Sequence, residues 1–409
     1  MSDELTDVAL AYHASFPPGK LGIKLTKRMD TQQDLALAYS PGVAAPVRAI
    51  ASDPELVYKY TAKGNLVAVI TDGSAVLGLG DLGPLASKPV MEGKAALFKR
   101  FANIDVFDIE IDAKNPQDFI DTVIRIAPTF GGINLEDIKG PQCFEIEQAL
   151  IEKLDIPLFH DDQHGTAVII AAGLLNALEL QNKSLDSVKI VCVGAGAAGV
   201  AAAHLLLSLG VPRNNLHLVD RQGAIHSLRK DLNPYKAVFA IHTPHRSLAD
   251  CCKGADVFIG VSGANVLTAD MLASMAARPI VFALSNPDPE INPALAHQVR
   301  NDLILATGRS DYPNQLNNVL CFPYIFRGAL DVRARKINRA MLLAVVYALK
   351  DLAKEPILDE VFQAYPGSEG LEFGPHYILP KPTDPRLIER LPQAVAKAAI
   401  GSGVAKISL

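Results

Sequence analysis

The sequence predicts an α/β protein of two domains with mostly parallel strands, followed by C-terminal helices. From about residue 65 onward, short β-branched runs alternate with helical patterns, which is typical of parallel α/β folds. The chain has 409 residues, whereas a single hydrophobic core rarely serves more than about 250–300 residues. We therefore expect a first domain over 1–163, a second over 164–330 and a helical segment over 331–409.

Composition places the chain among ordinary globular proteins. Hydrophobic residues make up 49% and charged residues 20%, so the chain can bury enough apolar surface to fold, which excludes a disordered protein. The formal net charge is −5. It argues against a nucleic-acid partner, because phosphate binding requires a basic surface.

The cysteines, the first residues and the apolar stretches together predict a cytoplasmic protein. The five cysteines are an odd set without C-x-x-C spacing, so a reducing compartment fits better than a disulfide framework. Residues 1–7 are acidic and lack the pattern of a signal peptide. The most apolar stretches, 166–180 and 341–349, do not supply the ~20 apolar residues of a membrane span. We expect no membrane partner.

Periodicity predicts the elements of the first domain. Residues 67–71 are a continuous apolar run, typical of a buried strand, and 107–112 alternate strictly between apolar and acidic residues. The other expected elements are helices over 116–126 and 142–154 and strands over 133–135 and 157–159.

The second domain opens with a strand, a glycine-rich turn and an Ala/Leu-rich helix that ends near Leu209. The expected strands span 189–193, 216–219, 256–259, 280–284 and 303–306, and C-terminal helices are expected over 339–354 and 392–400.

The glycine-rich turn has the G-x-G-x-x-G spacing of a Rossmann-type dinucleotide-binding domain. Its residues are Gly194, Ala195, Gly196, Ala197, Ala198 and Gly199. Such glycines permit a tight turn and a close approach of the backbone to a pyrophosphate, whose charge lies at the helix N-terminus. The next strand ends at Asp220, about 20 residues further on, where an acidic side chain can accept a hydrogen bond from the adenosine ribose. The alternative is a glycine turn that only packs a helix on a strand.

The end of that strand leaves the choice of nicotinamide cofactor open. Asp220 favours NAD, because a carboxylate repels a 2′-phosphate. Arg221 follows immediately and could pair with that phosphate of NADP, or could be an ordinary solvated charge.

Two acidic pairs follow neighbouring strands of the first domain. They are Glu136-Asp137 and Asp161-Asp162. Ligands bind outside the carboxyl ends of such strands, so both pairs can face one crevice and hold a divalent cation, with oxygen ligands suited to Mg²⁺ or Mn²⁺. The alternative is helix capping by Asp161 and Asp162. We exclude the flanking His160 and His164 as ligands, because a His beside a strand end more often has a structural role.

Beyond these patterns, long segments of the chain resemble the malic enzymes, especially the short bacterial ones. The similar motifs, in order, lie at 34–46 (D-L-A-L-A-Y-S-P-G-V-A-A-P), 71–83 (T-D-G-S-A-V-L-G-L-G-D-L-G), 90–95 (V-M-E-G-K-A), 134–138 (N-L-E-D-I), 159–167 (F-H-D-D-Q-H-G-T-A), 284–287 (L-S-N-P), 315–319 (Q-L-N-N-V) and 394–404. They cover nearly the whole chain, and their order makes the set far more specific than any one motif. The first domain would then bind malate and metal, and the second NAD(P).

The resemblance implies roles for individual residues. Lys94 would be the general base that takes the hydroxyl proton of malate, and Tyr39 the general acid that protonates the enol of pyruvate. Metal would be held by the acidic residues Glu136, Asp137 and Asp162, with Asp161 in support. Asn286 and Asn318 would hold the substrate or the nicotinamide, with Asn317 a weaker candidate, and Gly194 to Gly199 the pyrophosphate.

The resulting hypothesis is the oxidative decarboxylation of (S)-malate to pyruvate and CO₂, with NAD(P)⁺ and Mg²⁺ or Mn²⁺. The alternatives are a malolactic-type decarboxylase that keeps its cofactor bound, and a nucleotide-sensing protein of the same fold without turnover. Longer relatives carry an Arg, gripping a substrate carboxylate, where this chain has Ala75. The resemblance also implies a homodimer or larger homo-oligomer, and the segment before Val67 is a candidate for exchange between subunits.

Overall fold

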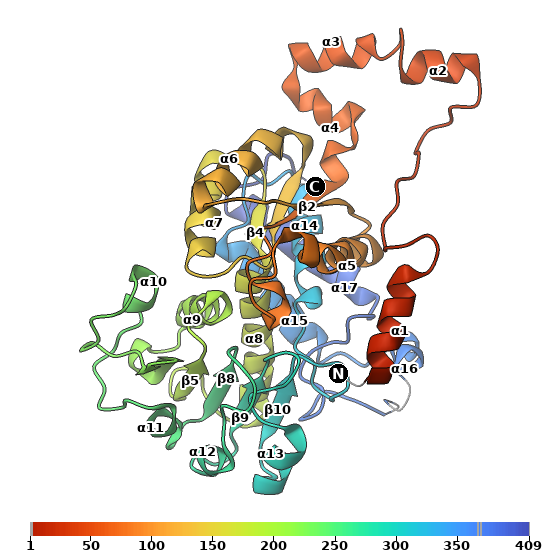
Figure 1. Cartoon of the computed structure of the whole chain (residues 1–409). Helices are drawn as coiled ribbons and strands as arrows, with labels where there is room; N and C mark the ends of the chain where they lie inside the picture. The colour runs from red at the N-terminus through yellow and green to blue at the C-terminus, as the bar shows by residue number, and fades with distance from the viewer. Residues whose placement is uncertain (1–2, 366–367, 369, 409) are drawn as a thin grey trace.

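Two parallel sheets organise the chain, as the sequence predicts. The computed structural model describes residues 3–365, 368 and 370–408 (Figure 1). The first sheet has the order β2-β1-β3-β4 and is parallel throughout. Its strands are β1 (Leu66–Thr71), β2 (Asp105–Glu110), β3 (Gly132–Leu135) and β4 (Leu158–His160). Every residue of the two central strands is buried, because helices cover both faces of a parallel sheet.

The second sheet is that of a dinucleotide-binding domain, with the order β10-β9-β8-β5-β6-β7. Its strands are β5 (Ile190–Val193), β6 (Leu216–Asp220), β7 (Gly223–Ala224), β8 (Val257–Gly260), β9 (Ile280–Ala283) and β10 (Ile304–Thr307). All pairs are parallel except β6–β7, a short antiparallel edge that the sequence does not signal. The mixed α/β fold class is confirmed.

Helices surround both sheets and connect them. Around the first sheet lie α5 (Pro84–Ala102), α6 (Pro116–Ile126) and α7 (Gln142–Lys153), and around the second α9 (Ala197–Leu209), α10 (Pro234–Ala237), α11 (Leu248–Cys252), α12 (Ala269–Ala273) and α13 (Pro293–Val299). The 20-residue helix α8 (Asp161–Leu180) runs from the first sheet to the second. Its apolar residues belong to the largest hydrophobic cluster.

The C-terminal helices are α14 (Phe322–Asp331), α15 (Arg339–Leu352), α16 (Asp359–Ala364) and α17 (Arg386–Gly401). Helix α14 packs against α5, α15 packs against α8, and α17 packs against both α14 and α15. The predicted helix over 392–400 begins too late, because Pro392 lies inside α17 and not at its start. Pro392 is buried beside Gly328 of α14, where a β-carbon on the glycine would lie 2.5 Å from the Pro392 carbonyl oxygen. This close packing holds the helix through the proline.

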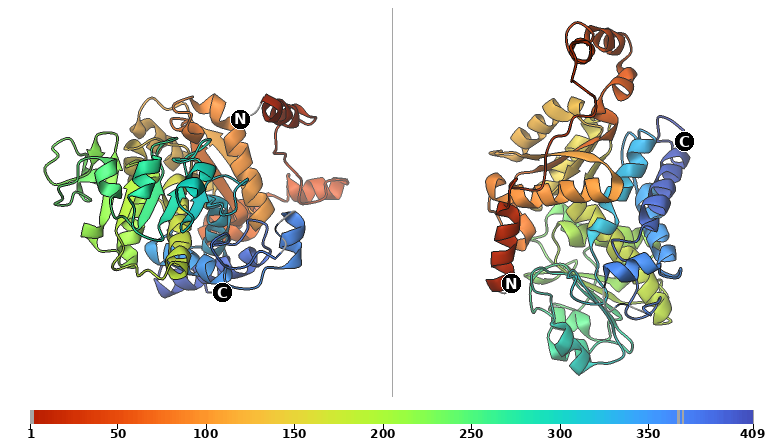
Figure 2. Two further views of the ribbon diagram at one scale, coloured as in Figure 1. Left: turned by 90° about the horizontal axis from the view of Figure 1, so that it is seen from below. Right: turned by 90° about the vertical axis from the view of Figure 1, so that its right-hand side faces the viewer.

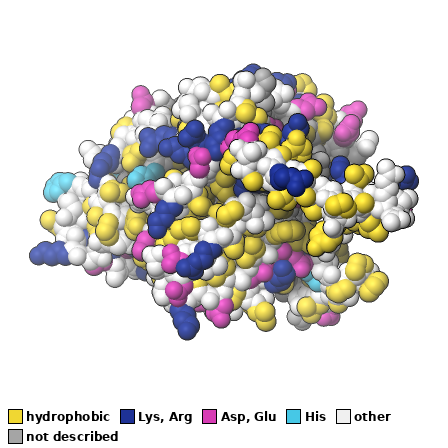
Figure 3. Space-filling view, turned by 90° about the horizontal axis from the view of Figure 1, so that it is seen from above, with side chains coloured by type: hydrophobic (Ala, Val, Ile, Leu, Met, Phe, Trp, Pro, Cys, Tyr) yellow, Lys and Arg dark blue, Asp and Glu magenta, His cyan; other side chains and the backbone are white. Residues whose placement is uncertain are grey.

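An N-terminal arm projects from the body. It contains α1 (Asp3–Ala14), which lies beside the body, then α2 (Gln32–Ala38) and α3 (Ala44–Ser52), which stand away from it, and α4 (Val57–Tyr60), whose Tyr58 ring lies 4.6 Å from the Arg333 guanidinium (Figures 1 and 2). None of these last three helices has a buried residue. Hydrophobic side chains are spread over this face of the molecule among Lys and Arg (Figure 3). The arm therefore presents apolar surface that its own chain does not cover.

No helix in the described residues has both the length and the apolar run needed to cross a bilayer.

Candidate active site

Lys94 lies at the centre of a buried charge cluster between the two sheets. Its ammonium is 2.6 Å from Asp161 Oδ2 and 2.9 Å from Glu136 Oε1, and 4.3 Å from the centroid of the Phe322 ring. Helix α5 supplies Lys94, the segment after β3 supplies Glu136, and the first turn of α8 supplies Asp161. Residues far apart in the sequence therefore meet at the carboxyl ends of the first sheet's strands, where α/β proteins bind ligands.

Three predicted metal ligands also converge there. One carboxylate oxygen from each of Glu136, Asp137 and Asp162 lies within 4.8 Å of the other two. Asn134, on β3, donates to the second oxygen of Glu136 at 2.9 Å, and the Asp137 amide donates to Asp162 Oδ2 at 2.8 Å. These bonds fix the positions of the carboxylates.

The pKa values of these carboxyl groups show how costly the cluster is without a cation. Burial, with the neighbouring carboxylates, raises the pKa of Glu136 to about 7 and that of Asp137 to about 8. Burial also raises the pKa of Asp162 to about 6, although Lys94 acts against it. The buried Oδ2 of Asp137 has no hydrogen-bond partner among the described residues. An all-oxygen set with an unsatisfied buried oxygen fits a hard divalent cation such as Mg²⁺ or Mn²⁺.

The alternative of helix capping does not describe these side chains. The N-cap of α8 is His160, which makes no side-chain capping bond, and Asp161 and Asp162 lie in the first turn. Their carboxylates face Lys94 and the Asp137 amide instead. A β-carbon at Gly165 would lie 1.9 Å from Asp161 Oδ1, so the glycine one turn later provides the space for that carboxylate.

The flanking histidines are not among the grouped ligands. Both ring nitrogens of His160 are buried without a described hydrogen-bond partner, and burial lowers its pKa to about 4. His164 contacts Glu147 Oε1 at 2.7 Å, which fastens α8 to α7. That both histidines lie outside the metal set stays a prediction.

The glycine-rich turn has the geometry that a pyrophosphate requires. Gly194 has a φ of +107°, and a β-carbon there would lie 2.4 Å from the Val261 carbonyl oxygen. At Gly199 a β-carbon would lie 1.8 Å from the Gly194 carbonyl oxygen, whereas the space around Gly196 is open. Gly196 is also the N-cap of α9 and gives it no side-chain cap. The first amides of α9 are therefore left for an anionic ligand.

Asp220 does lie at the end of β6, but its carboxylate already has cationic partners. Arg229 binds Oδ1 at 2.7 Å, and Lys236 binds Oδ2 at 2.8 Å. Despite burial, these bonds lower the pKa of Asp220 below its ordinary value. Arg229 also pairs with Asp231. Neither partner could be recognised from the sequence, because Arg229 lies on the following loop and Lys236 in α10, whereas only Arg221 is adjacent to Asp220.

The predicted asparagines lie on two loops of the second domain. Asn318 begins a short 3₁₀ helix and packs against Gly165, so it adjoins the charge cluster. Asn286 follows β9 and lies against Gly308, exposed to solvent. Asn317 caps the 3₁₀ helix through the Val319 amide at 2.9 Å, which gives it a structural role.

Tyr39, the second predicted proton carrier, does not lie at the Lys94 cluster of its own chain. It caps the end of α2 on the projecting arm, and its side chain is 76% exposed. Figure 1 shows α2 at the far end of the molecule from the interdomain region that holds α8.

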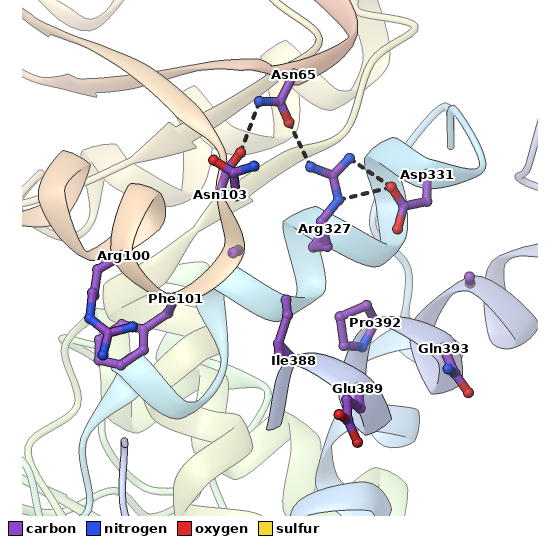
Figure 4. A pocket seen from close by; sticks show the side chains of 12 residues that line it. Asn65, Arg100, Phe101, Asn103, Arg327, Asp331, Ile388, Glu389, Pro392 and Gln393 are labelled. Carbon is purple, nitrogen blue, oxygen red and sulfur yellow. Dashed lines mark hydrogen bonds and ion pairs between the residues drawn. The ribbon is translucent and has the colours of Figure 1, made fainter. Parts of the chain in front are cut away.

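An open cavity elsewhere is not this site. It has a volume of about 680 Å³ and lies between α5, α14 and α17 (Figure 4). Its polar wall is a closed network in which Arg327 pairs with Asp331 and Asn65. It lies at the C-terminal end of α5, and none of the predicted catalytic, metal or cofactor residues lines it.

Sequence reasoning missed two other residues of the cluster. Phe322 packs its ring against Lys94, and Asn134 orients Glu136. Asn134 could have been found from the sequence, because it is a polar residue in an otherwise apolar strand, two positions before an acidic pair. Phe322 carries none, because its position depends on the tertiary packing of α14 against α5.

A carboxylate cluster with a buried lysine, joined by one helix to a dinucleotide-binding fold, defines a metal-dependent oxidoreductase of the nicotinamide class. The family models of the malic enzyme N-terminal domain and of the malic enzyme NAD binding domain match residues 18–151 and 163–369. The chain belongs to the malic enzyme family.

Individual relatives can be aligned with nearly the whole of this chain. The NADP-dependent malic enzyme of Halomonas elongata is 62% identical, over 99% of this chain and 96% of its own. That of Escherichia coli K12 is 55% identical, but this chain spans only 54% of it. Among solved structures, malic enzyme from Pyrococcus horikoshii is 44% identical, with a TM-score of 0.90 over 99% of this chain and 93% of that one.

The family relationship sets the reaction. The chain is an NAD(P)-dependent malic enzyme, which oxidatively decarboxylates malate to pyruvate and CO₂. An NAD-dependent relative from Rhizobium meliloti is 55% identical, over 52% of its own length. Names among relatives of similar identity therefore include both cofactors.

Proposed function

We propose that the chain uses NADP⁺ as its hydride acceptor, with Lys94 and Tyr39 as its proton carriers and Glu136, Asp137 and Asp162 as its metal ligands. The observation that carries the cofactor choice is the pairing of Asp220 with Arg229 and Lys236. Two cations on one carboxylate remove the repulsion that would exclude a 2′-phosphate. Lys236 remains a quarter exposed and can reach that phosphate.

Proton balance links the two proton carriers. Malate loses a hydride from C2 to the cofactor, its hydroxyl proton to Lys94, and the C4 carboxylate as CO₂. The enolate then gains one proton at C3 to give pyruvate, so the turnover releases no net proton. One proton is thus given to Lys94 and one is delivered to C3, and the balance is met when Tyr39 delivers the second, directly or through water.

Lys94 must lose its own proton before it can act as the base. Burial by itself lowers the pKa of Lys94, but Asp161 and Glu136 outweigh burial and raise it above its ordinary value. A divalent cation bound by the carboxylates would polarise the ketone, stabilise the enolate and offset this negative field. Asp161, at 2.6 Å, is placed to exchange a proton with the lysine.

We assign Tyr39 to the active site of a second copy of the chain. It must meet Lys94 in each turnover, yet it lies on an arm that its own body does not bury. The apolar side chains on that arm include Leu35, Leu37, Val43 and Val47, all exposed. Covering them against a second copy would stabilise a homodimer and complete the site. The five buried free cysteines fit a cytoplasmic setting for this dimer.

The test is malate-dependent formation of reduced cofactor, followed by absorbance. NADP⁺ and NAD⁺ are compared, each with Mn²⁺ or with a chelator. We expect net reduction of NADP⁺ that requires Mn²⁺ and a higher kcat/KM for NADP⁺ than for NAD⁺. Lactate formation without net reduction would instead indicate the malolactic reaction. Cofactor binding without turnover would indicate a nucleotide sensor.

A further inference from the structure

Glu290 is a buried carboxylate outside the metal cluster. It lies between β9 and α13, with none of its surface exposed. No ion pair is described for it in residues 3–365, 368 and 370–408, although a buried charge without a cation is costly. Its hydrogen-bond partners are backbone amides and the Ser262 side chain. Burial raises the pKa of Glu290, and hydrogen bonds from these amides act against that rise.

The two oxygens of Glu290 bind two different loops. Oε1 accepts from the Ser262 amide at 2.9 Å, on the loop after β8, and Oε2 accepts from the Ser285 amide at 3.0 Å, on the loop after β9. The Glu290 backbone adds a third link, because its carbonyl accepts from the Leu267 amide at 2.9 Å. One residue therefore joins the loops that follow two neighbouring strands.

Both loops lead to predicted cofactor contacts. A β-carbon at Gly194 would lie 3.1 Å from Ser262 Cβ, so the loop after β8 packs on the first glycine of the pyrophosphate turn. Ser285 directly precedes Asn286, predicted to hold the substrate or the nicotinamide. A single carboxylate therefore holds both the loop beside the pyrophosphate turn and the loop that carries Asn286.

The last residue of β8 provides the space for this carboxylate. A β-carbon at Gly260 would lie 2.4 Å from Glu290 Cδ and 2.7 Å from Oε1. Gly260 has no positive φ, so its lack of a side chain serves the Glu290 carboxylate and not a special turn.

We propose that Glu290 is a positioning residue for the dinucleotide, holding the loops after β8 and β9 at the separation that the bound cofactor requires. It does not touch the reacting atoms. The inference rests on the proposed function, because it assumes that the cofactor occupies the crevice between these loops. The two amide donors lie on different loops and require two acceptor oxygens. A carboxylate offers two, whereas a carboxamide of the same size offers one.

The experiment compares Glu290→Gln and Gly260→Ala with a control, Asp288→Asn. Gln keeps the size but turns an NH₂ group toward one of the two amides, and the alanine methyl displaces the carboxylate. Asp288 is on the same loop, with a side chain 69% exposed and 3.9 Å from Arg309. KM values for NADP⁺, malate and Mn²⁺ are measured separately, and NADPH binding is titrated by its fluorescence.

We expect the KM for NADP⁺ and the Kd for NADPH to rise about tenfold or more in both test variants, as for loss of a hydrogen bond to a charged group. The KM for Mn²⁺ should be unchanged, and the control should behave as wild type. Unchanged NADPH binding in either folded variant would overturn the inference, as would a fall in thermal stability with the KM for NADP⁺ unchanged. If Glu290→Gln does not fold, Gly260→Ala decides. If the wild-type chain binds NADPH but does not oxidise malate, the proposed function is wrong. The NADPH titration then still tests the role of Glu290.

Discussion

At the scale of single residues, the site places one lysine among several buried carboxylates, which repel one another when all are ionised and no metal ion is bound. Lys94 pairs with Asp161 and Glu136, and three further pairings among Glu136, Asp137 and Asp162 bring like charges together. The negative charge of the cluster raises the pKa of Lys94, and burial raises the pKa of the carboxyl groups, so both kinds of group keep their protons. A bound divalent cation reverses both tendencies, so metal binding and activation of the base are linked.

Replacement of Asp162 tests the metal assignment. Asp162→Asn keeps the shape and removes one full charge from the ligand set. We expect the affinity for Mn²⁺ to fall at least about 10- to 100-fold, the range found even for outer-shell partners, and activity to recover partly at high Mn²⁺. The measurement is the Mn²⁺ dependence of malate oxidation. Asp155→Asn is the control, because Asp155 is an exposed carboxylate that pairs with Lys406 and not with the cluster. Equal Mn²⁺ dependence in both variants would remove Asp162 from the ligand set.

The raised carboxyl pKa values predict a pH-dependent effect of metal on stability. A group whose pKa is raised by folding binds its proton more tightly in the folded state, so the metal-free fold loses stability as pH rises from about 4 through the folded values. Those values are about 6 for Asp162, 7 for Glu136 and 8 for Asp137. Mn²⁺ competes with these protons, so we expect it to raise Tm more at pH 8 than at pH 6. Thermal unfolding with and without Mn²⁺ checks this, and an equal increase at both values would contradict it.

At the scale of elements, α8 carries both the proposed metal ligand Asp162 and the packing between the sheets. Its first turn bears Asp161 and Asp162, and the remainder is largely buried against α9 and α15. Gly165 reconciles the two roles, since any β-carbon there would overlap the Asp161 carboxylate.

Substitution of glycines in α8 separates these roles. Glycine to alanine inside a helix ordinarily stabilises by up to about 1 kcal/mol. We expect Gly165→Ala instead to destabilise by about 1–3 kcal/mol, the cost of overpacking, and to lower activity by moving Asp161 off Lys94. Gly173→Ala is the matched control, because a β-carbon there meets its neighbours at 3.5–3.6 Å, ordinary contact distances. Denaturant unfolding and malate oxidation measure both effects. A neutral Gly165→Ala would show that Asp161 moves without consequence.

The sequence predicts those helices and strands whose hydrophobic periodicity or turn residues can be recognised within the element itself. All strands of the two sheets except the short edge strand β7, and the helices α6, α7, α9 and α15, follow from periodicity and from the glycine-rich turn. Helix α5 was not predicted, although it carries Lys94, because Pro89 and Gly93 interrupt its helical pattern. The acidic cluster could be expected from the topology of parallel strands. The pairing of Asp220 with Lys236 could not, because it depends on how a long loop folds back.

At the scale of the whole molecule, the arm separates Tyr39 from Lys94 of its own chain. Its apolar side chains and Tyr39 lie outside the body, while Lys94 lies deep within it. Neither proton carrier can complete the reaction without the other, so the proposed catalytic unit is a pair of chains.

Complementation between inactive variants tests this. Lys94→Ala and Tyr39→Phe should each lose about 10²–10⁴-fold in activity, as general acid–base catalysts do. Mixed dimers should regain one intact site, with Lys94 from one chain and Tyr39 from the other. Co-expression in equal amounts should therefore restore about a quarter of wild-type activity, since half of the dimers are mixed and each has one working site of two. Activity no greater than that of the separate variants would place both residues in the same chain.

Helix α8 also determines where this enzyme can be recombined with a relative. Its first residues belong to the proposed metal site, and the rest of the helix belongs to the core shared by the second sheet and the C-terminal helices. A chimera joined near residue 163, between the two family domains, would combine a metal ligand from one parent with a supporting helix from the other. A join after Leu180 keeps α8 with the metal centre, and a join before Asp161 keeps it with the cofactor domain. Exchange of cofactor domains between malic enzymes should therefore succeed when α8 is inherited whole.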